Sequence, residues 1–142
     1  MSKIAALDLG DQWIGIALSD SLKMFARPFT TIKAAELDHF LKDFIEEQEL
    51  ETIVIGLPKT MSGTLSKQTE KIIALKEQLA IAFSQVPFVL WDERLSSKRA
   101  VSLQKTKKEQ SKQTDHAIAA AFILDSYLLF LKPTSLDSEH SY

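Results

Sequence analysis

The stretch Ile4-Ala-Ala-Leu-Asp-Leu-Gly10, followed by Ile14-Gly-Ile-Ala-Leu18, decides the fold of this chain. Both runs are short and apolar, which is typical of buried strands, and Gly10 begins the short connection between them. Asp8 lies inside the first run, where a carboxylate is costly unless a metal ion, a basic partner or hydrogen bonds compensate it. We therefore interpret Asp8 as part of a functional site, with a turn residue that caps its own backbone as the alternative.

The rest of the chain alternates between strand and helix patterns. Strands are expected at Lys3 to Leu9, Trp13 to Ser19, Met24 to Ile32, Thr52 to Gly56 and Pro87 to Trp91. Helices are expected at Glu36 to Gln48, Ser66 to Phe83, Ser96 to Leu103 and, after a Thr114 cap, up to Leu131. Pro28 indicates that the third strand lies at a sheet edge or beside a bulge. The order predicts an α/β fold with a five-stranded mixed sheet, in which three antiparallel strands precede parallel crossovers and helices cover both faces.

The length and composition are those of one globular domain. The chain has 142 residues, of which 45% are hydrophobic and 25% charged, and we expect a single domain over residues 1–133 with a flexible tail over 134–142. It has no cysteine, which excludes disulfides, thiolate zinc sites and cysteine nucleophiles. No apolar run is long enough to cross a bilayer, and the signal-peptide pattern is missing. We expect a cytoplasmic protein that does not contact membranes.

Charges of opposite sign are concentrated in two segments. Residues 36–51 are rich in acids and residues 94–113 are rich in bases, although the net charge is only −2. A phosphate polymer would avoid the first segment and bind the second, unless both are simply solvated surface. The loop from Gly56 to Thr64 could hold a phosphate, or be an ordinary strand-to-helix connection. The residues that we expect to contact nucleic acid are Lys59, Arg94, Lys98, Arg99, Lys105, Lys107, Lys108 and Lys112.

Acids from three separate elements are expected at one end of the sheet. They are Asp8, one of Asp92 and Glu93 at the end of the fifth strand, and Asp115 at the start of the last helix. The alternation of side chains along a strand allows only one of the adjacent pair into a given site. Such a set provides oxygen ligands for a hard divalent cation, which can activate water in phosphodiester hydrolysis. Taken singly, each acid is also explained as a solvated strand end or a first-turn helix residue.

Three further side chains bear on this site. Asp115 is expected on the inward face of its helix, because Ile118, Ala119 and Phe122 follow at helical spacing. His116 either tunes the site or faces solvent, and His39 is expected on a helix surface. The contribution of Asp11 is left open.

Four motifs in order resemble the YqgF/RuvX family of Holliday junction resolvases. They are Leu7-Asp-Leu-Gly10 with Ile14-Gly-Ile-Ala17, Gly56-Leu-Pro58 with Gly63-Thr64, Asp92-Glu-Arg-Leu-Ser-Ser97, and Asp115 with Ala119-Ala120. The resemblance covers Lys3 to Leu131 and implies an RNase H-like fold. It also implies a nuclease that matures the 5′ end of the 16S ribosomal RNA precursor or resolves branched DNA. By the same resemblance, Asp8, Glu93 and Asp115 are the catalytic residues and the ligands of Mg²⁺ or Mn²⁺.

The chain departs from this family at two places. Asp11, Gln12 and Trp13 stand where the family commonly has small and basic residues, and the strand from Thr52 to Gly56 has no acid. Because few carboxylates are available as metal ligands, a non-catalytic RNA-binding factor in ribosome assembly is an alternative function. A phosphotransferase of the actin and sugar-kinase type shares the Asp-x-Gly hairpin but needs two copies of the fold. We expect a monomer acting on structured RNA, whereas a junction resolvase would require a two-fold dimer.

Overall fold

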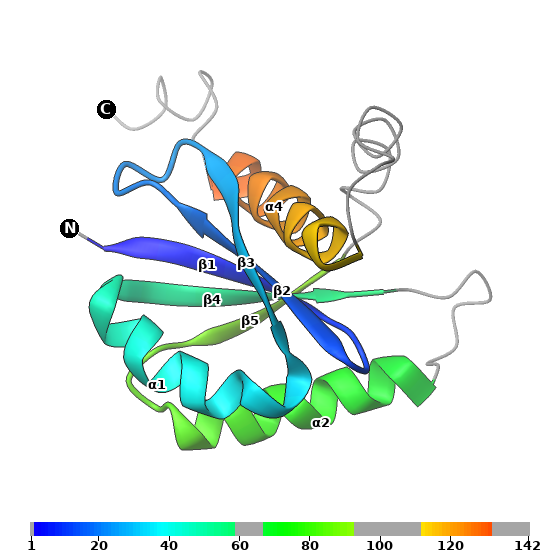
Figure 1. Cartoon of the computed structure of the whole chain (residues 1–142). Coiled ribbons are helices and arrows are strands. Elements are labelled where there is room, and N and C mark those ends of the chain that lie inside the picture. Colours follow the sequence, from blue (N-terminus) through cyan, green and yellow to red (C-terminus); the bar gives the residue numbers. More distant parts are fainter. Residues whose placement is uncertain (1, 59–66, 93–111, 132–142) are drawn as a thin grey trace.

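A single five-stranded sheet forms the centre of the protein. The computed structural model describes residues 2–58, 67–92 and 112–131. The strands are β1 (Lys3–Leu9), β2 (Trp13–Ser19), β3 (Ala26–Lys33), β4 (Leu50–Leu57) and β5 (Phe88–Asp92). The helices are η1 (Ala34–Glu36), α1 (Leu37–Glu47), α2 (Lys67–Ala82) and α4 (Lys112–Leu131). Helices α1 and α2 cover one face of the sheet and α4 crosses the other (Figure 1).

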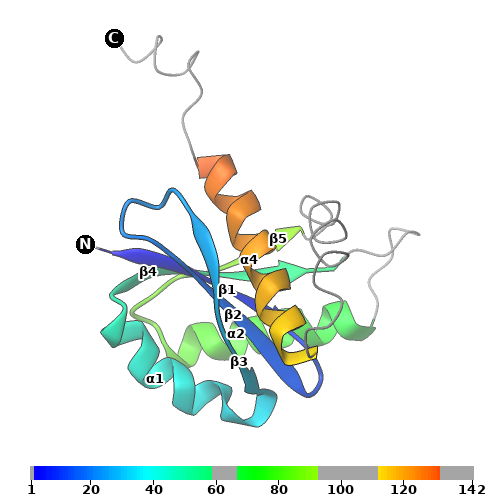
Figure 2. The same ribbon diagram turned by 45° about the horizontal axis from the view of Figure 1, so that its top comes forward.

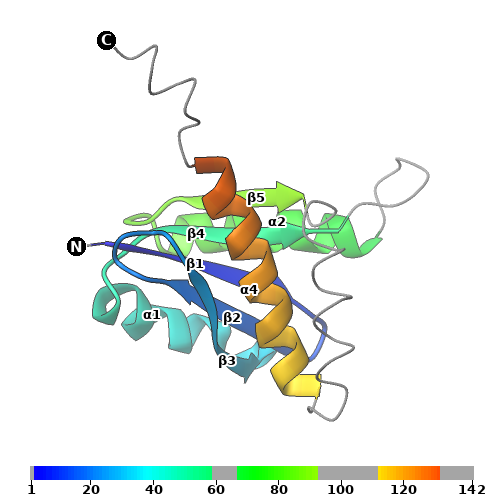
Figure 3. The same ribbon diagram turned by 90° about the horizontal axis from the view of Figure 1, so that it is seen from above.

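The strand pairing confirms the predicted mixed sheet. The spatial order is β3-β2-β1-β4-β5, with β1–β2 and β2–β3 antiparallel and β1–β4 and β4–β5 parallel. The three N-terminal strands form a meander, and the two later strands enter through helical crossovers. Helix α4 lies across β1, β2 and β3, as the views from two further directions show (Figures 2 and 3).

Alternating side chains divide the sheet between two cores. Leu7 and Ile55 face α1 and α2, whereas Ala6 and Val54 face α4. Small residues line the α4 side of the sheet, so that this helix packs closely against it. The larger core under α1 and α2 holds fully buried leucine and isoleucine side chains, each of which contributes about 1.5–3 kcal/mol.

The third strand begins later than the sequence pattern predicts. The carboxylate of Asp20 accepts hydrogen bonds from the backbone N–H groups of Met24 and Phe25, at 2.9 and 2.8 Å, and these bonds hold both residues in the turn. The bond from Phe25 keeps the pKa of Asp20 below its ordinary value. The expectation for Pro28 is confirmed, since β3 is an edge strand and its pairing with β2 shifts register beside Pro28.

The start of the last helix corrects a second prediction. Helix α4 begins at Lys112, so Thr114 lies within its first turn and is not the residue that precedes it. Lys112 and Gln113 are both good helix formers, which explains the extension. The expected helix at 96–103 and the tail at 134–142 lie outside the described residues. Within the part of the chain that is described, no helix is long and apolar enough to cross a membrane.

Candidate active site at the start of helix α4

Asp8 lies near the end of β1, on the face of the sheet that α4 covers. It pairs with Gly15 of β2, and its neighbours on the same face are Ile4 and Ala6, which pack toward α4. The Asp8 side chain is half-buried, with 20% of its surface exposed. The strand therefore fixes the carboxylate in position while leaving it accessible to a ligand.

The nearest described partner of Asp8 is His116, in the first turns of α4. His116 Nδ1 lies 3.3 Å from Asp8 Oδ2 and donates to the carboxylate when Nδ1 carries a proton. This hydrogen bond raises the pKa of His116 above its ordinary value, with a smaller contribution from the charge of Asp115. Sequence reasoning did not identify His116 as the partner of Asp8, because nothing in the local pattern connects them.

Gly15 allows α4 to approach Asp8 so closely, whereas a Cβ at Gly10 would meet α4 only at an ordinary contact distance. A Cβ added at Gly15 would lie 1.9 Å from the carbonyl oxygen of His116 and 2.7 Å from the backbone nitrogen of Ala117. A Cβ at Gly10 would lie 3.4 Å from His116 Cε1. The backbone of the helix thus rests directly on β2 where that strand pairs with Asp8. The glycine after Ile14 was the sequence signal for this contact.

Asp115 is brought to the same end of the sheet, although less deeply than predicted. It is half-buried, and its charge reaches His116. Of the predicted inward residues, Ile118 is buried, whereas Ala119 and Phe122 are only half-buried. The inward face of α4 is centred on Ala117, Ala120, Leu124 and Leu128. The reason is the contact at Gly15, which places the backbone at His116 and Ala117 against the sheet and leaves Asp115 at the margin.

Side-chain alternation along β5 gives the direction of Asp92, one of the two acids at its end. Trp91 faces α4, where its indole N–H donates to Ser126 Oγ at 3.1 Å, whereas Leu90 packs on the core under α1 and α2. Asp92 follows Trp91 and so points to the α1 and α2 face, opposite to Asp8. Of the two acids, Glu93 thus remains the candidate for the Asp8 site. Glu93 lies outside the described residues, and its role stays a prediction.

The described part of the proposed metal site consists of two carboxylates. Across residues 2–58, 67–92 and 112–131, no three His, Asp or Glu side chains converge in a way that could hold a metal ion. Asp8 and Asp115 are therefore the described members of the predicted set. Asp11 is exposed in the β1–β2 turn, and His39 is exposed on α1, as expected.

Of the eight residues predicted to contact nucleic acid, seven lie outside the described residues. They are Lys59, Arg94, Lys98, Arg99, Lys105, Lys107 and Lys108. Lys112 is described as the first residue of α4. Its position at the end of the sheet that holds Asp8 agrees with a contact to substrate, which stays a prediction.

Comparison with protein families places nearly the whole chain in one of them. A family model described as RuvX, Holliday junction resolvase, matches residues 2–129. A protein of Thermoanaerobacter pseudethanolicus named "Putative pre-16S rRNA nuclease" is 40% identical over 133 residues, which cover 89% of this chain and 95% of the relative. A protein of Staphylococcus aureus with the same name is 34% identical, with coverage of 89% and 94%.

Two solved structures of resolvases have the same fold. RuvC of T. thermophilus, in complex with a Holliday junction substrate, aligns with a TM-score of 0.58 and 16% identity, covering 92% of this chain and 95% of that one. The yeast mitochondrial Holliday junction resolvase aligns with a TM-score of 0.57 and 10% identity, covering 99% of this chain and 81% of that one. At such low identity the likeness shows the fold alone, and it confirms the predicted RNase H-like architecture.

Proposed function

Because this chain belongs to the RuvX family of Holliday junction resolvases, we propose that it is a metal-dependent nuclease that matures the 5′ end of pre-16S ribosomal RNA. The names of relatives that are 34–40% identical over most of the chain support this substrate. Processing of ribosomal RNA also implies that the protein acts in the cytoplasm. We further propose that it acts as a monomer.

The position of Asp8 carries this proposal. Its carboxylate is carried by a strand, is one-fifth exposed, and lies beside the first turns of α4, which also bear Asp115. Two carboxylates from distant elements at one end of a sheet repel each other unless a cation or a proton lies between them. A nuclease that cuts a polyanion uses such a cation to offset the charge that develops on the reacting phosphate.

Mg²⁺ or Mn²⁺ fits the donor set, because both ions prefer carboxylate oxygens. Asp8 and Asp115 would hold the ion together with Glu93, and the ion would stabilise the developing charge and activate the attacking water. His116 would orient Asp8, since its ring contacts Oδ2 and leaves the other carboxylate oxygen for a ligand. Lys112 and the basic residues between Arg94 and Lys108 would neutralise phosphates of the substrate.

Resolution of branched DNA is the second candidate function. The observation that favours it is the fold shared with RuvC, whose structure was determined with a Holliday junction. Symmetric cleavage of a junction would require a two-fold dimer. Exposed apolar side chains on the β2–β3 hairpin, Leu22, Met24, Phe25 and Phe29, would then be candidates for the dimer contact.

The two functions are separated by a cleavage assay with both substrates. An end-labelled pre-16S RNA fragment and a labelled four-way DNA junction are incubated with the protein in Mn²⁺, in Mg²⁺ or in chelator. We expect metal-dependent cutting of the RNA, whereas preferential cutting of the junction would favour the resolvase. RNA binding without cutting in either metal would contradict the nuclease and favour a non-catalytic assembly factor.

A further inference from the structure

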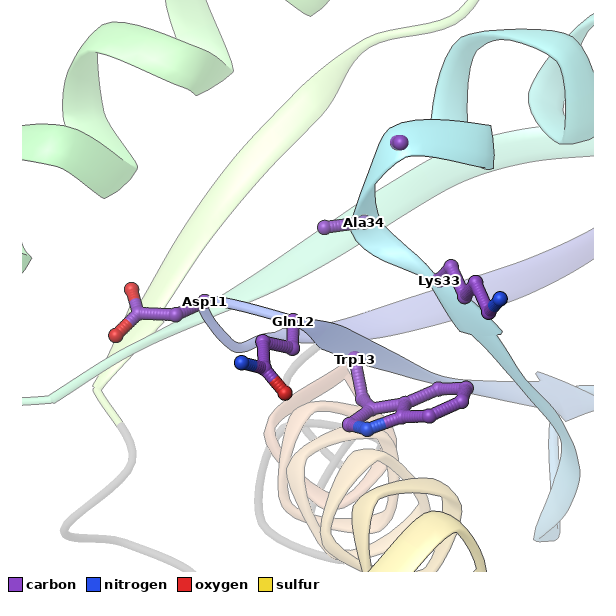
Figure 4. Close-up of a pocket in the computed structure, with 6 residues that line it drawn as sticks. Asp11, Gln12, Trp13, Lys33 and Ala34 are labelled. Carbon is purple, nitrogen blue, oxygen red and sulfur yellow. The ribbon is translucent and has the colours of Figure 1, made fainter.

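A hollow of about 340 Å³ lies at the tip of the β1–β2 hairpin, beside the candidate active site. Its lining residues are Asp11, Gln12, Trp13, Lys33, Ala34 and Ala35. Figure 4 shows the Trp13 ring and the Lys33 side chain at one end of this hollow and the Asp11 carboxylate at the other, pointing away from them. Neither Trp13 nor Lys33 has a role in the site described above.

Trp13 lies on the same face of the sheet as Asp8. In β2, Ile14, Ile16 and Leu18 face the core under α1 and α2, so Trp13 and Gly15 face the α4 side. Gly15 pairs with Asp8, and Trp13 is two residues away from Gly15, which is about 7 Å along the strand. A chain bound at Asp8 would therefore reach Trp13 with a neighbouring unit.

Trp13 is half-buried, and its backbone is held in the hairpin. The backbone carbonyl oxygen of Trp13 accepts a hydrogen bond from the N–H of Gly10 at 3.0 Å, which closes the hairpin turn. Trp13 also pairs with Lys33 of β3. Because the backbone that carries the ring is already ordered in the free protein, stacking of the ring on a ligand costs no loss of backbone conformational entropy at Trp13.

Lys33 supplies a positive charge next to this ring. The residue is exposed, and none of the ion pairs found among the described residues involves it. Gln12, between Asp11 and Trp13, is also exposed and offers both a donor and an acceptor through its amide. The aromatic face of Trp13 can stack on a base, and the Gln12 amide can bond the polar edge of that base. The Lys33 ammonium group can pair with the phosphate of the same nucleotide.

We propose that this hollow binds an unpaired nucleotide of the RNA substrate, next to the bond that is cut. The base stacks on Trp13, the Gln12 amide bonds its edge, and Lys33 pairs with the phosphate. Asp11 repels the backbone from the opposite end, which sets the direction of the strand across the site. This inference rests on the proposed nuclease function, and it adds to that function a requirement for a single-stranded or unstacked nucleotide beside the cleavage position.

Tryptophan fluorescence gives a direct test, because the chain has only two tryptophans, Trp13 and Trp91. The variant Trp91→Phe, combined with Asp8→Asn to prevent cutting, leaves Trp13 as the sole reporter. The probe is an unstructured pyrimidine RNA of about 10 nucleotides, beside DNA of the same sequence and an abasic RNA of equal charge. We expect the RNA to quench Trp13 emission in a saturable way and the abasic RNA not to do so.

Affinity measurements by fluorescence anisotropy test the two contacts separately. Trp13→Leu is expected to weaken RNA binding by about 5- to 100-fold, and Trp13→Phe to retain most of the affinity. Lys33→Ala is expected to weaken binding. It should also make the negative slope of log affinity against log salt concentration shallower by about 0.7. The matched control is Lys42→Ala, an exposed lysine on α1, which is expected to change neither quantity.

The outcomes separate this inference from the function on which it rests. One outcome is that the protein cuts RNA, that Trp13→Leu and Lys33→Ala bind RNA normally, and that RNA does not quench Trp13. The nucleotide-binding hollow is then wrong, whereas the nuclease function is supported. If the unmodified chain neither binds nor cuts RNA, both are wrong. Quenching by DNA but not by RNA would also overturn the assignment to RNA. If circular dichroism shows that Trp13→Leu does not fold, the quenching of Trp13 and the binding of Lys33→Ala still test the hollow.

Discussion

His116 Nδ1 lies 3.3 Å from Asp8 Oδ2, and this contact joins residues that are 108 positions apart in the chain. It connects the N-terminal hairpin to the start of the last helix, so the candidate site exists only in the folded protein. The backbone of His116 can lie there because Gly15 has no side chain to occupy the same space.

Replacing His116 should impair catalysis without unfolding the protein. Hydrogen-bond partners of carboxylate ligands orient them, and removing such a partner costs about 10- to 100-fold in metal affinity or activity. We expect His116→Ala to fall in this range, measured as cleavage rate against Mn²⁺ concentration. His39→Ala, an exposed histidine on α1, is the control and should behave as the unmodified chain does. Unchanged metal dependence in His116→Ala would remove His116 from the site.

A methyl group at position 15 should push α4 away from the sheet. In Gly15→Ala the new Cβ would overlap the carbonyl group of His116, with its nearest contact at 1.9 Å. Overpacking of this kind costs about 1–3 kcal/mol or more in the free energy of unfolding. Gly10→Ala, whose closest contact is 2.6 Å, should cost less. Equal denaturation midpoints for the two variants would contradict the close packing described at Gly15.

Ser19 should contribute stability at the end of the sheet remote from Asp8. Its side chain is 1% exposed, accepts the N–H of Ile4 at 2.9 Å and donates to the carbonyl of Asp20 at 2.9 Å. Ser19→Ala should lower the free energy of unfolding by about 1–3 kcal/mol, because a buried donor loses its acceptor. Cleavage should stay normal below the melting transition. Ser84→Ala, at an exposed serine, is the matched control for the urea titration.

Glu51 should make part of the stability dependent on pH. Lys23 Nζ donates to Glu51 Oε1 at 2.7 Å, and Ser2 Oγ donates to the same oxygen at 2.6 Å. The Lys23 contact is the main reason that the pKa of Glu51 is lowered. The stabilisation is therefore present above the pKa of the unfolded chain and is lost as the pH falls through the lowered pKa.

The measurement compares Glu51→Gln with the unmodified chain in urea, near pH 7 and at about pH 3. Both partners of this pair are about a third exposed, so solvent screening limits the difference at neutral pH to less than about 1 kcal/mol. The difference should shrink at acid pH. Glu46→Gln, exposed on α1, serves as the control. A difference that grows on acidification would show that the pKa shift has the opposite sign.

The sequence predicted the sheet well because its signals are local. Apolar alternation and turn residues identified all five strands, and the position of Pro28 indicated the edge of the sheet. The start of β3 was misplaced because the Asp20 carboxylate bonds the N–H groups of Met24 and Phe25, a side-chain effect that periodicity does not reveal.

The site was predicted less completely, because its contacts are long-range. Asp8 and Asp115 were identified as acids at the same end of the sheet, but the pairing of Asp8 with His116 depends on how α4 rests on Gly15. The local pattern left Asp92 and Glu93 as alternatives, and the resemblance to the family selected Glu93. The direction of Trp91, which places Asp92 on the face opposite to Asp8, agrees with that selection.

One pair of substitutions tests most directly whether metal-dependent cleavage requires the Asp8 carboxylate. Asp8→Asn keeps the shape of the side chain and removes its charge, and Asp43→Asn makes the same change at an exposed aspartate on α1. Single-turnover cleavage of the end-labelled pre-16S RNA fragment is measured for both variants in Mn²⁺. We expect Asp8→Asn to cut no faster than the chelator control, and Asp43→Asn to cut nearly normally. Cleavage by Asp8→Asn at the rate of the unmodified chain would contradict this expectation.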